Sequence, residues 1–83
     1  MMYVFELLGC NESNLQAVKA AIATIPGVSS FSITMSALGS YVLFIECNYV
    51  EEEILSLLNA ALTTLGVTAV KAPPESKPKT PKP

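Results

Sequence analysis

The chain shows the same order of hydrophobic patterns twice, once in each half. Alternation of apolar and polar residues is typical of a half-buried strand, and apolar residues three or four apart are typical of an amphipathic helix. Each half therefore predicts a strand, a helix and a second strand. The expected strands cover residues 2–8, 31–35, 41–47 and 67–71, and the expected helices cover residues 15–25 and 51–65.

The residues at the ends of the first helix support its position. Ser13, followed three residues later by Gln16, forms a capping-box pattern, which marks a helix start. Pro26 and Gly27 predict the end, because proline cannot continue a helix and glycine tolerates the turn. The apolar residues between these signals fall on one helical face: Leu15, Val18, Ile22 and Ile25.

The second helix is expected to begin just after Asn48 and to end at Gly66, a natural C-terminal cap. Glu51, Glu52 and Glu53 occupy its first turn, where the helix dipole favours anions. These carboxylates could form a cation site, but a solvated helix start is the preferred interpretation. The expected buried stripe consists of Ile54, Leu58, Ala61, Leu62 and Leu65.

This order of elements predicts an α+β, ferredoxin-like fold over residues 1–72. The residues Ala37, Leu38 and Gly39 form the turn between the two middle strands. Right-handed crossovers then leave one solution, a four-stranded antiparallel sheet in the order 4-1-3-2 with both helices on one face.

The two strand glutamates, Glu6 and Glu46, should avoid the face that the helices cover. This assigns alternate residues of the first three strands to the core, and Cys47 with them. The expected core residues of these strands are Tyr3, Phe5, Leu7, Phe31, Ile33, Met35, Tyr41, Leu43 and Ile45.

The same alternation puts Val4, Val42 and Phe44 on the open face of the two central strands, with Glu6 and Glu46 at the margin. Exposed apolar patches often mark interfaces, although antiparallel sheets also tolerate scattered apolar residues on a wet face. An interface is the preferred interpretation. The neighbouring strand lines this face with small polar residues: Ser30, Ser32 and Thr34.

Charge is distributed unevenly along the chain, whose net charge is −2. Residues 1–72 hold two lysines and six glutamates, a balance of −4, while residues 73–83 hold three lysines and one glutamate, a balance of +2. There is no arginine. Binding of nucleic acid by the folded part is therefore not expected, because neutralising phosphates requires a basic surface. RNA stacking on Phe44 is disfavoured for the same reason.

Residues 73–83 predict a disordered tail, because prolines alternate with lysines and no core can form. Residues 78–81 match the PxxP pattern of polyproline ligands, but a solvated tail is the preferred interpretation. No uncharged apolar run is long enough for a membrane span, and residues 1–8 lack the features of a signal peptide. We therefore expect a cytoplasmic protein that does not enter a membrane.

Most enzyme chemistry is excluded by composition. The chain has no histidine, so it cannot form a Ser–His or Cys–His pair. Without arginine it has no bidentate clamp for phosphate or carboxylate. No glycine-rich phosphate loop is present. We expect neither an enzyme nor a bound cofactor.

The two cysteines, Cys10 and Cys47, occupy different settings. Cys10 precedes the first helix, where a helix N-terminus can lower a thiol pKa, and Cys47 ends the third strand. In the 4-1-3-2 order they lie at opposite ends of the sheet, too far apart for a disulfide. Simple packing is preferred to a reactive role for Cys10.

Residues 21–28, which read Ala-Ile-Ala-Thr-Ile-Pro-Gly-Val, resemble the heavy-metal-associated domain. Residues 53–55 (Glu-Ile-Leu) leading to residues 65–70 (Leu-Gly-Val-Thr-Ala-Val) resemble it too. The resemblance covers residues 3–71. In that family a Gly-Met-x-Cys-x-x-Cys loop between the first strand and the first helix binds copper or other soft metals.

The corresponding loop of this chain lacks the paired cysteines. Aligned without gaps on Val18, the two family positions fall on Asn11 and Asn14, and after a one-residue slip they fall on Cys10 and Ser13. At most one thiolate remains, and soft-metal binding requires at least two. We therefore expect no metal site in a single chain.

The pattern of helix, Pro-Gly-Val and strand also resembles ACT domains and the ligand-sensing domains of Lrp-type regulators. The ACT family implies an Asp-x-x-Gly loop, but residues 9–13 read Gly-Cys-Asn-Glu-Ser. The Lrp-type motif has a hairpin glycine followed by an aspartate. Gly39 matches the hairpin glycine, but Ser40 and Tyr41 stand where the motif has its aspartate. These resemblances imply a shared fold and transfer no function.

With 51% hydrophobic and only 14% charged residues, the chain is more apolar than a small monomer readily hides. We expect a non-enzymatic interaction or regulatory module that self-associates or binds a protein partner through the open sheet face. The alternative is a small-ligand or metal-handling module of heavy-metal-associated descent, with Cys10 as its only remaining loop thiol.

Overall fold

A computed structural model describes residues 1–72 of the chain. The predicted order and type of elements are confirmed. The elements are β1 (Met2–Leu8), α1 (Leu15–Ala23), β2 (Val28–Met35), β3 (Tyr41–Cys47), α2 (Glu51–Leu62), the 3-10 turn η1 (Thr63–Leu65) and β4 (Thr68–Lys71). The predicted proline–lysine tail over residues 73–83 lies outside the described residues.

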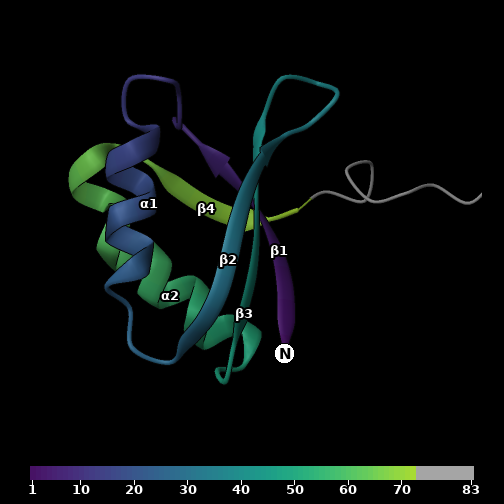
Figure 1. The fold of residues 1–83 in the computed structure, drawn as a ribbon, viewed down its shortest axis with the longest axis vertical. Helices are drawn as coiled ribbons and strands as arrows, with labels where there is room; N and C mark the ends of the chain where they lie inside the picture. The colour runs from purple at the N-terminus through teal and green to yellow at the C-terminus, as the bar shows by residue number, and fades with distance from the viewer. Residues whose placement is uncertain (73–83) are drawn as a thin grey trace, which may run out of the picture.

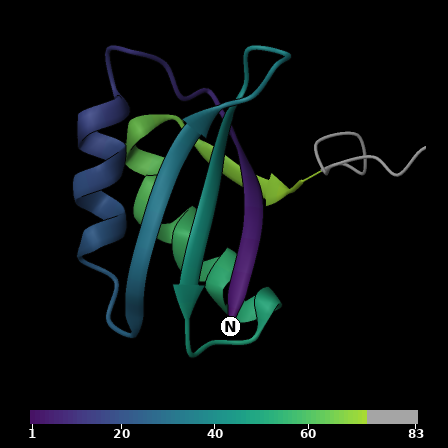
Figure 2. The same cartoon turned by 45° about the vertical axis from the view of Figure 1, so that its right-hand side comes forward.

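The four strands form one antiparallel sheet in the order β2-β3-β1-β4. Figures 1 and 2 show both helices on the same side of this sheet. The central strands β3 and β1 are paired on both sides, while β2 and β4 form the edges. The predicted ferredoxin-like α+β fold and its 4-1-3-2 strand order are therefore confirmed.

The first helix ends at Ala23, two residues before the predicted end at residue 25. The N–H groups of Thr24 and Ile25 donate to carbonyls three residues back, on Ala21 at 3.2 Å and on Ile22 at 3.1 Å. The Thr24 hydroxyl also donates to the Ala21 carbonyl at 2.7 Å. These bonds tighten the last turn into a 3-10 geometry, which ends the α-helix while Ile25 remains buried, as its position on the helix stripe predicted.

The second strand begins at Val28, three residues before the predicted start at residue 31. Val28 pairs with Cys47 and Ser30 pairs with Glu46, so Ser29 is an extra residue in the ladder. Such a bulge breaks the period-two alternation. The alternation of side chains therefore could not reveal that the strand continues through this point.

The predicted cap at Gly66 is confirmed. Gly66 has a φ of +73° and donates its N–H to the Thr63 carbonyl at 3.1 Å. The N–H of Val67 donates to the Leu62 carbonyl at 3.3 Å, which completes a Schellman motif. Residues 63–65, predicted as helix, form the 3-10 turn that leads into this cap.

The core fills the space between the helices and one face of the sheet, and the predicted inward sides of β1 and β3 are confirmed. Met35 is the exception, because it was predicted to lie in the core and is 55% exposed. It ends an edge strand beside the hairpin, and on the same strand Phe31 and Ile33 are only half-buried. The side chains with no exposed surface are Phe5, Val18, Ile22, Leu43, Ile45, Cys47, Ile54, Leu58 and Leu62.

Candidate functional site

The open face of the sheet has Phe44 near its centre. The register puts Phe44 directly between Val4 on β1 and Ser32 on β2. Phe44 is 38% exposed and Val4 is half-buried. Val42, opposite Glu6 in the next row, retains only 6% of its surface. Of the three predicted apolar residues, Phe44 and Val4 are therefore the accessible ones.

The apolar surface extends along β1 in both directions. Met2 is 59% exposed and Leu8 is 45% exposed, and both share the side of β1 on which Val4 lies. We call Met2, Val4, Leu8 and Phe44 the open-face patch. Met2 and Leu8 were not predicted to lie in this surface, although the alternation that assigned Val4 also reaches them.

The two strand glutamates differ in their positions on this face. Glu46 lies opposite Met2 near one end of the sheet. Glu6 was expected at the margin, but it lies between Val42 on β3 and Val70 on β4, inside the face. Because an unpaired carboxylate is costly to bury, a surface that covers the patch must offer Glu6 a hydrogen-bond donor or a cation.

The loop between β1 and α1, where the resemblance suggested ligands, is held together by its own side chains. The N–H of Asn11 donates to Oδ1 of Asn14 at 2.8 Å, and the N–H of Asn14 donates to Oδ1 of Asn11 at 3.1 Å. Nδ2 of Asn14 donates to the Gly9 carbonyl at 3.0 Å. Both side-chain amides are therefore engaged in hydrogen bonds to backbone groups of the loop.

These contacts also correct the predicted capping box. Asn14, one residue after Ser13, is the cap residue of α1, and its carbonyl accepts the N–H of Val18 at 2.9 Å. No side chain caps the first turn, because Asn14 reaches back to Asn11 and Gly9. Ser13 is exposed in the loop before the helix.

Cys10 is half-buried and packs against the core. Burial raises the pKa of the Cys10 thiol above its ordinary value. The expected helix effect, which would lower that pKa, is therefore outweighed. A thiol with a raised pKa is protonated at neutral pH and is a poor nucleophile.

Cys47 is fully buried at the end of β3, beside the start of β1, while Cys10 follows the other end of β1. Both cysteines are free. Among residues 1–72, no three metal-ligating side chains of the His, Cys, Asp or Glu type come together.

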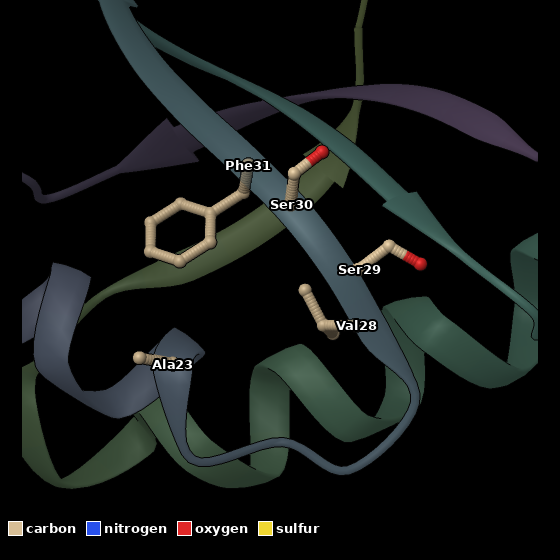
Figure 3. A pocket seen from close by; sticks show the side chains of 5 residues that line it. All are labelled: Ala23, Val28, Ser29, Ser30 and Phe31. Carbon is tan, nitrogen blue, oxygen red and sulfur yellow. The ribbon is translucent and has the colours of Figure 1, made fainter.

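Cavities also lie beside the strands of the sheet. One, of about 370 Å³, lies between the end of α1 and the edge strand β2 and is lined by Ala23, Val28, Ser29, Ser30 and Phe31. Figure 3 shows the Phe31 ring extending from β2 toward α1, while the hydroxyl groups of Ser29 and Ser30 point away from the ring. The lining has no titratable group, so it offers contact and no acid–base chemistry.

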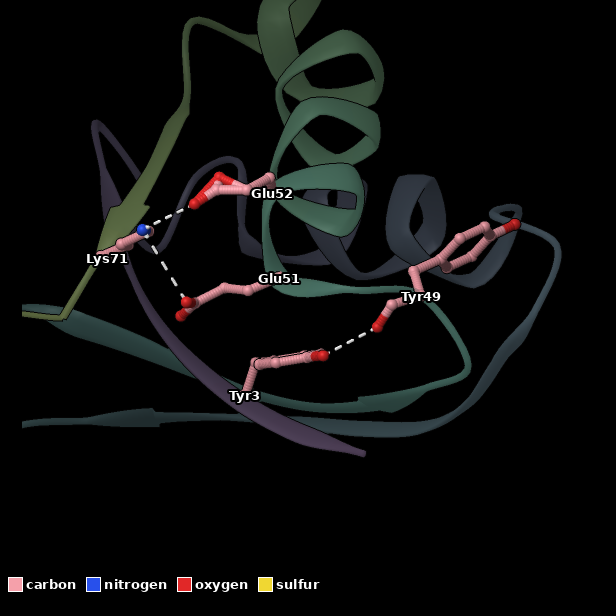
Figure 4. A network of polar contacts seen from close by, with 5 residues as sticks. All are labelled: Tyr3, Tyr49, Glu51, Glu52 and Lys71. Atoms are coloured by element: carbon pink, nitrogen blue, oxygen red, sulfur yellow. Dashed lines mark hydrogen bonds and ion pairs between the residues drawn. The ribbon is translucent and has the colours of Figure 1, made fainter.

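Another cavity, of about 390 Å³, is lined by residues of β1, α2 and β4 that include Tyr3, Glu51 and Lys71. The Lys71 ammonium lies 3.1 Å from a carboxylate oxygen of Glu52 and 3.8 Å from one of Glu51 (Figure 4). The hydrogen bond to Glu52 and the charges of both carboxylates raise the pKa of Lys71. The single positive charge of Lys71 offsets one of the two carboxylate charges, and the ion pairs link β4 to α2.

Tyr3 connects the start of β1 to the segment before α2. Its hydroxyl donates to the Tyr49 carbonyl at 2.8 Å (Figure 4). Burial raises the pKa of Tyr3, and the nearby carboxylate of Glu51 adds to this rise. The hydroxyl therefore stays protonated and holds a structural hydrogen bond.

Asn59 on α2 is a polar residue for which the sequence pattern predicted no role. Its Nδ2 donates to the carbonyls of Leu55 and Ala69, both at 3.1 Å, and its Oδ1 accepts the Ala69 N–H at 2.8 Å. The amide therefore satisfies both backbone groups that Ala69 turns away from β1. An Asn inside an apolar helical stripe is the only signal that could have indicated this role.

Comparison of the chain with protein-family models, with curated proteins and with solved structures finds no match. The resemblance to heavy-metal-associated, ACT and Lrp-type domains therefore stays a prediction. Within residues 1–72, neither helix has the length and apolar character needed to cross a membrane.

Proposed function

We propose that this protein is a non-enzymatic interaction module that binds a protein surface through the open-face patch. The observation that carries the proposal is the exposure of Phe44, Met2 and Leu8 together on the face of the sheet that no helix covers. Large apolar side chains gathered on one face are typical of an interface. Both cysteines are free thiols, which fits a cytoplasmic, reducing setting.

The chemistry of the partner follows from the residues around the patch. Phe44 requires an apolar counterpart, and Glu6 requires a donor or a cation close to that counterpart. The partner surface is therefore apolar at its centre with a basic or hydrogen-bonding group beside it. Glu46 at one end of the patch favours positive charge at the rim.

No specific observation favours the metal-handling alternative. The Cys10 thiol is half-buried with a raised pKa, and the amides of Asn11 and Asn14 are engaged in the loop backbone. A soft metal would find a single protonated sulfur there.

The test replaces Phe44 at the centre of the patch. Phe44→Glu puts a charge on the open face without touching the core, so the fold should be retained by circular dichroism. The matched control, Ser56→Glu, adds the same charge at an exposed position of α2 in the opposite layer. The full chain, affinity-tagged, is used to co-purify partners from its native source.

A partner recovered with the wild type and with Ser56→Glu should be lost with Phe44→Glu, and its purified form should bind at least about tenfold more weakly. Equal recovery by all three proteins would contradict the proposal, and Phe44 would then be an apolar residue that the sheet merely tolerates.

A further inference from the structure

The edge strand β2 lacks the features that keep sheet edges from pairing. It is eight residues long, and within residues 1–72 no strand lies on its outer side. No charged residue occurs between Lys19 and Glu46, a stretch that includes the whole of β2 and the first five residues of β3. Monomeric proteins usually protect an edge with lysine, proline or a short strand. The bulge at Ser29 is the only such device in β2, and it leaves residues 30–35 regular.

The register shows which backbone groups face outward from β2. The N–H of Ser36 donates to the Ser40 carbonyl at 2.7 Å, so Ser36 is directed toward β3. Backbone direction alternates along a strand, so Thr34 and Ser32 are also directed toward β3. The N–H and C=O groups of the residues between them therefore point away from the sheet: Phe31, Ile33 and Met35.

The opposite edge of the sheet is closed. β4 has only four residues and carries Lys71. The outward N–H and C=O of Ala69 are both bonded to the Asn59 side chain. The contrast between the two edges identifies β2 as the edge that is available for pairing.

We propose that β2 pairs antiparallel with β2 of a second copy, around a two-fold axis at Ile33, to give one continuous eight-stranded sheet. In this register Ile33 lies opposite its own counterpart, and Phe31 lies opposite Met35 of the other copy. The two-fold axis generates three residue pairs, one between the two Ile33 residues and two between Phe31 and Met35. Each pair forms two backbone hydrogen bonds, so the outward groups form six hydrogen bonds in total.

The side chains around the axis explain why the occupant is a second copy. Phe31 is half-buried and Met35 is 55% exposed, and they lie two residues on either side of Ile33. The two-fold therefore brings each Met35 against a Phe31 ring, a favourable contact of sulfur with an aromatic ring. On the open face Ser32 lies opposite Thr34, a pair that can form a hydrogen bond.

The cavity beside β2 adds to this fit. It is lined by Val28 and Phe31 of the strand and by Ala23 at the end of α1 (Figure 3). In the proposed register the hairpin of the second copy, with Leu38 at 84% exposure, runs along this cavity. The absence of charge on the strand removes the repulsion that two acidic domains would otherwise feel at close range.

The register is tested by cysteine cross-linking of the full chain in a background that carries Cys10→Ser and Cys47→Ala. In a hydrogen-bonded antiparallel pair the Cα atoms are about 5.5 Å apart, within the range of a disulfide. Ile33→Cys should therefore convert most of the chain to a covalent dimer on mild oxidation. Ser32→Cys, one residue from the axis, should cross-link poorly alone but efficiently when mixed with Thr34→Cys.

A second variant tests the backbone pairing without cross-links. Met35→Pro removes an outward N–H while leaving the bonds to β3, and proline is tolerated at such edge positions. It should weaken the dimer about tenfold or more in sedimentation velocity, because two of the six bonds are lost. Met35→Thr, which keeps the N–H, should weaken it less.

Phe44→Glu separates this inference from the proposed function, because Phe44 is on the face of the sheet and not at its edge. Dimers that persist in Phe44→Glu and are lost in Met35→Pro support pairing through β2. A wild-type chain that stays monomeric at all concentrations, with no cross-link at Ile33→Cys, overturns it. Dimers that cross-link at Phe44→Cys and not at Ile33→Cys also overturn it and assign self-association to the open-face patch.

Discussion

At the β4 edge of the sheet, the Asn59 side chain takes the place of a neighbouring strand. Asn59 bonds to both the N–H and the C=O of Ala69, as a strand residue would. The sequence predicted the apolar stripe of α2 correctly but gave no reason to single out Asn59. Propensity and periodicity describe the role of a residue within its own helix or strand. Asn59 belongs to α2 but forms its hydrogen bonds with the backbone of β4.

Replacing Asn59 should therefore cost more than an ordinary helix substitution. Asn59→Ala leaves the two backbone groups of Ala69 without their partner, and each unsatisfied buried group costs about 1–3 kcal/mol. We expect the free energy of unfolding in urea to fall by about 2 kcal/mol. Ser56→Ala, an exposed change on the same helix, is the control and should leave it nearly unchanged.

Gly9 allows two turns to pack closely. It has a φ of +88°, and a Cβ there would lie 2.5 Å from the carbonyl oxygen of Gly66. Gly39 has the same φ, but a Cβ on it would meet no atom within 4 Å. The two positions therefore share the backbone cost of a substitution and differ only in crowding.

Alanine at each position should separate these two effects. Gly39→Ala should lower the free energy of unfolding by about 1 kcal/mol through backbone strain alone. Gly9→Ala should cost about 1–3 kcal/mol more, because the Gly66 backbone must move. Chemical denaturation of both variants measures the difference, and equal losses would show that the two turns can separate freely.

At the scale of elements, the strands were predictable where alternation was unbroken. The bounds of β1 and β3 agree with the prediction because each has an apolar inner side and at least one charged residue outside. The start of β2 was missed because the bulge at Ser29 shifts the alternation by one residue. A bulge depends on pairing with β3, which one strand's sequence does not specify.

The candidate site shows the same division. The side of the sheet on which Val4 and Phe44 lie followed from alternation. The loss of Val42 from the accessible surface did not, because its burial depends on neighbours from two other strands. The loop around Asn11 and Asn14 closes on itself through a reciprocal pair of hydrogen bonds that spacing alone does not indicate.

At the scale of the whole molecule, the shifted pKa values all change stability in the same direction. Folding raises the pKa of Cys10, Tyr3 and Lys71 above their ordinary values of 9.0, 10.0 and 10.5. The folded state therefore holds these protons when the unfolded state has begun to release them. The stabilisation that comes from this extra proton binding is fully present at pH values below the ordinary pKa values. It is lost as the pH rises through the pKa values of the folded state.

We therefore expect the melting temperature to fall as the pH rises above about 9, more steeply than for a variant that lacks Tyr3 and Lys71. Thermal melts of the wild type and of Tyr3→Phe with Lys71→Met, from pH 7 to pH 11, provide the measurement. The double variant removes two of the three groups, so its curve should be flatter on the alkaline side. Parallel curves would show that these shifts do not contribute.

The closed edge at Asn59 also limits how large an assembly can grow. A sheet with two open edges can add copies at both ends, which is the geometry of an endless fibre. The proposed dimer, joined through β2, would have only two β4 edges left, and on each of them Asn59 already occupies the outward groups of Ala69. A third copy therefore finds no free backbone groups at Ala69 with which to pair. The side chain of Asn59 thus limits the assembly to two copies.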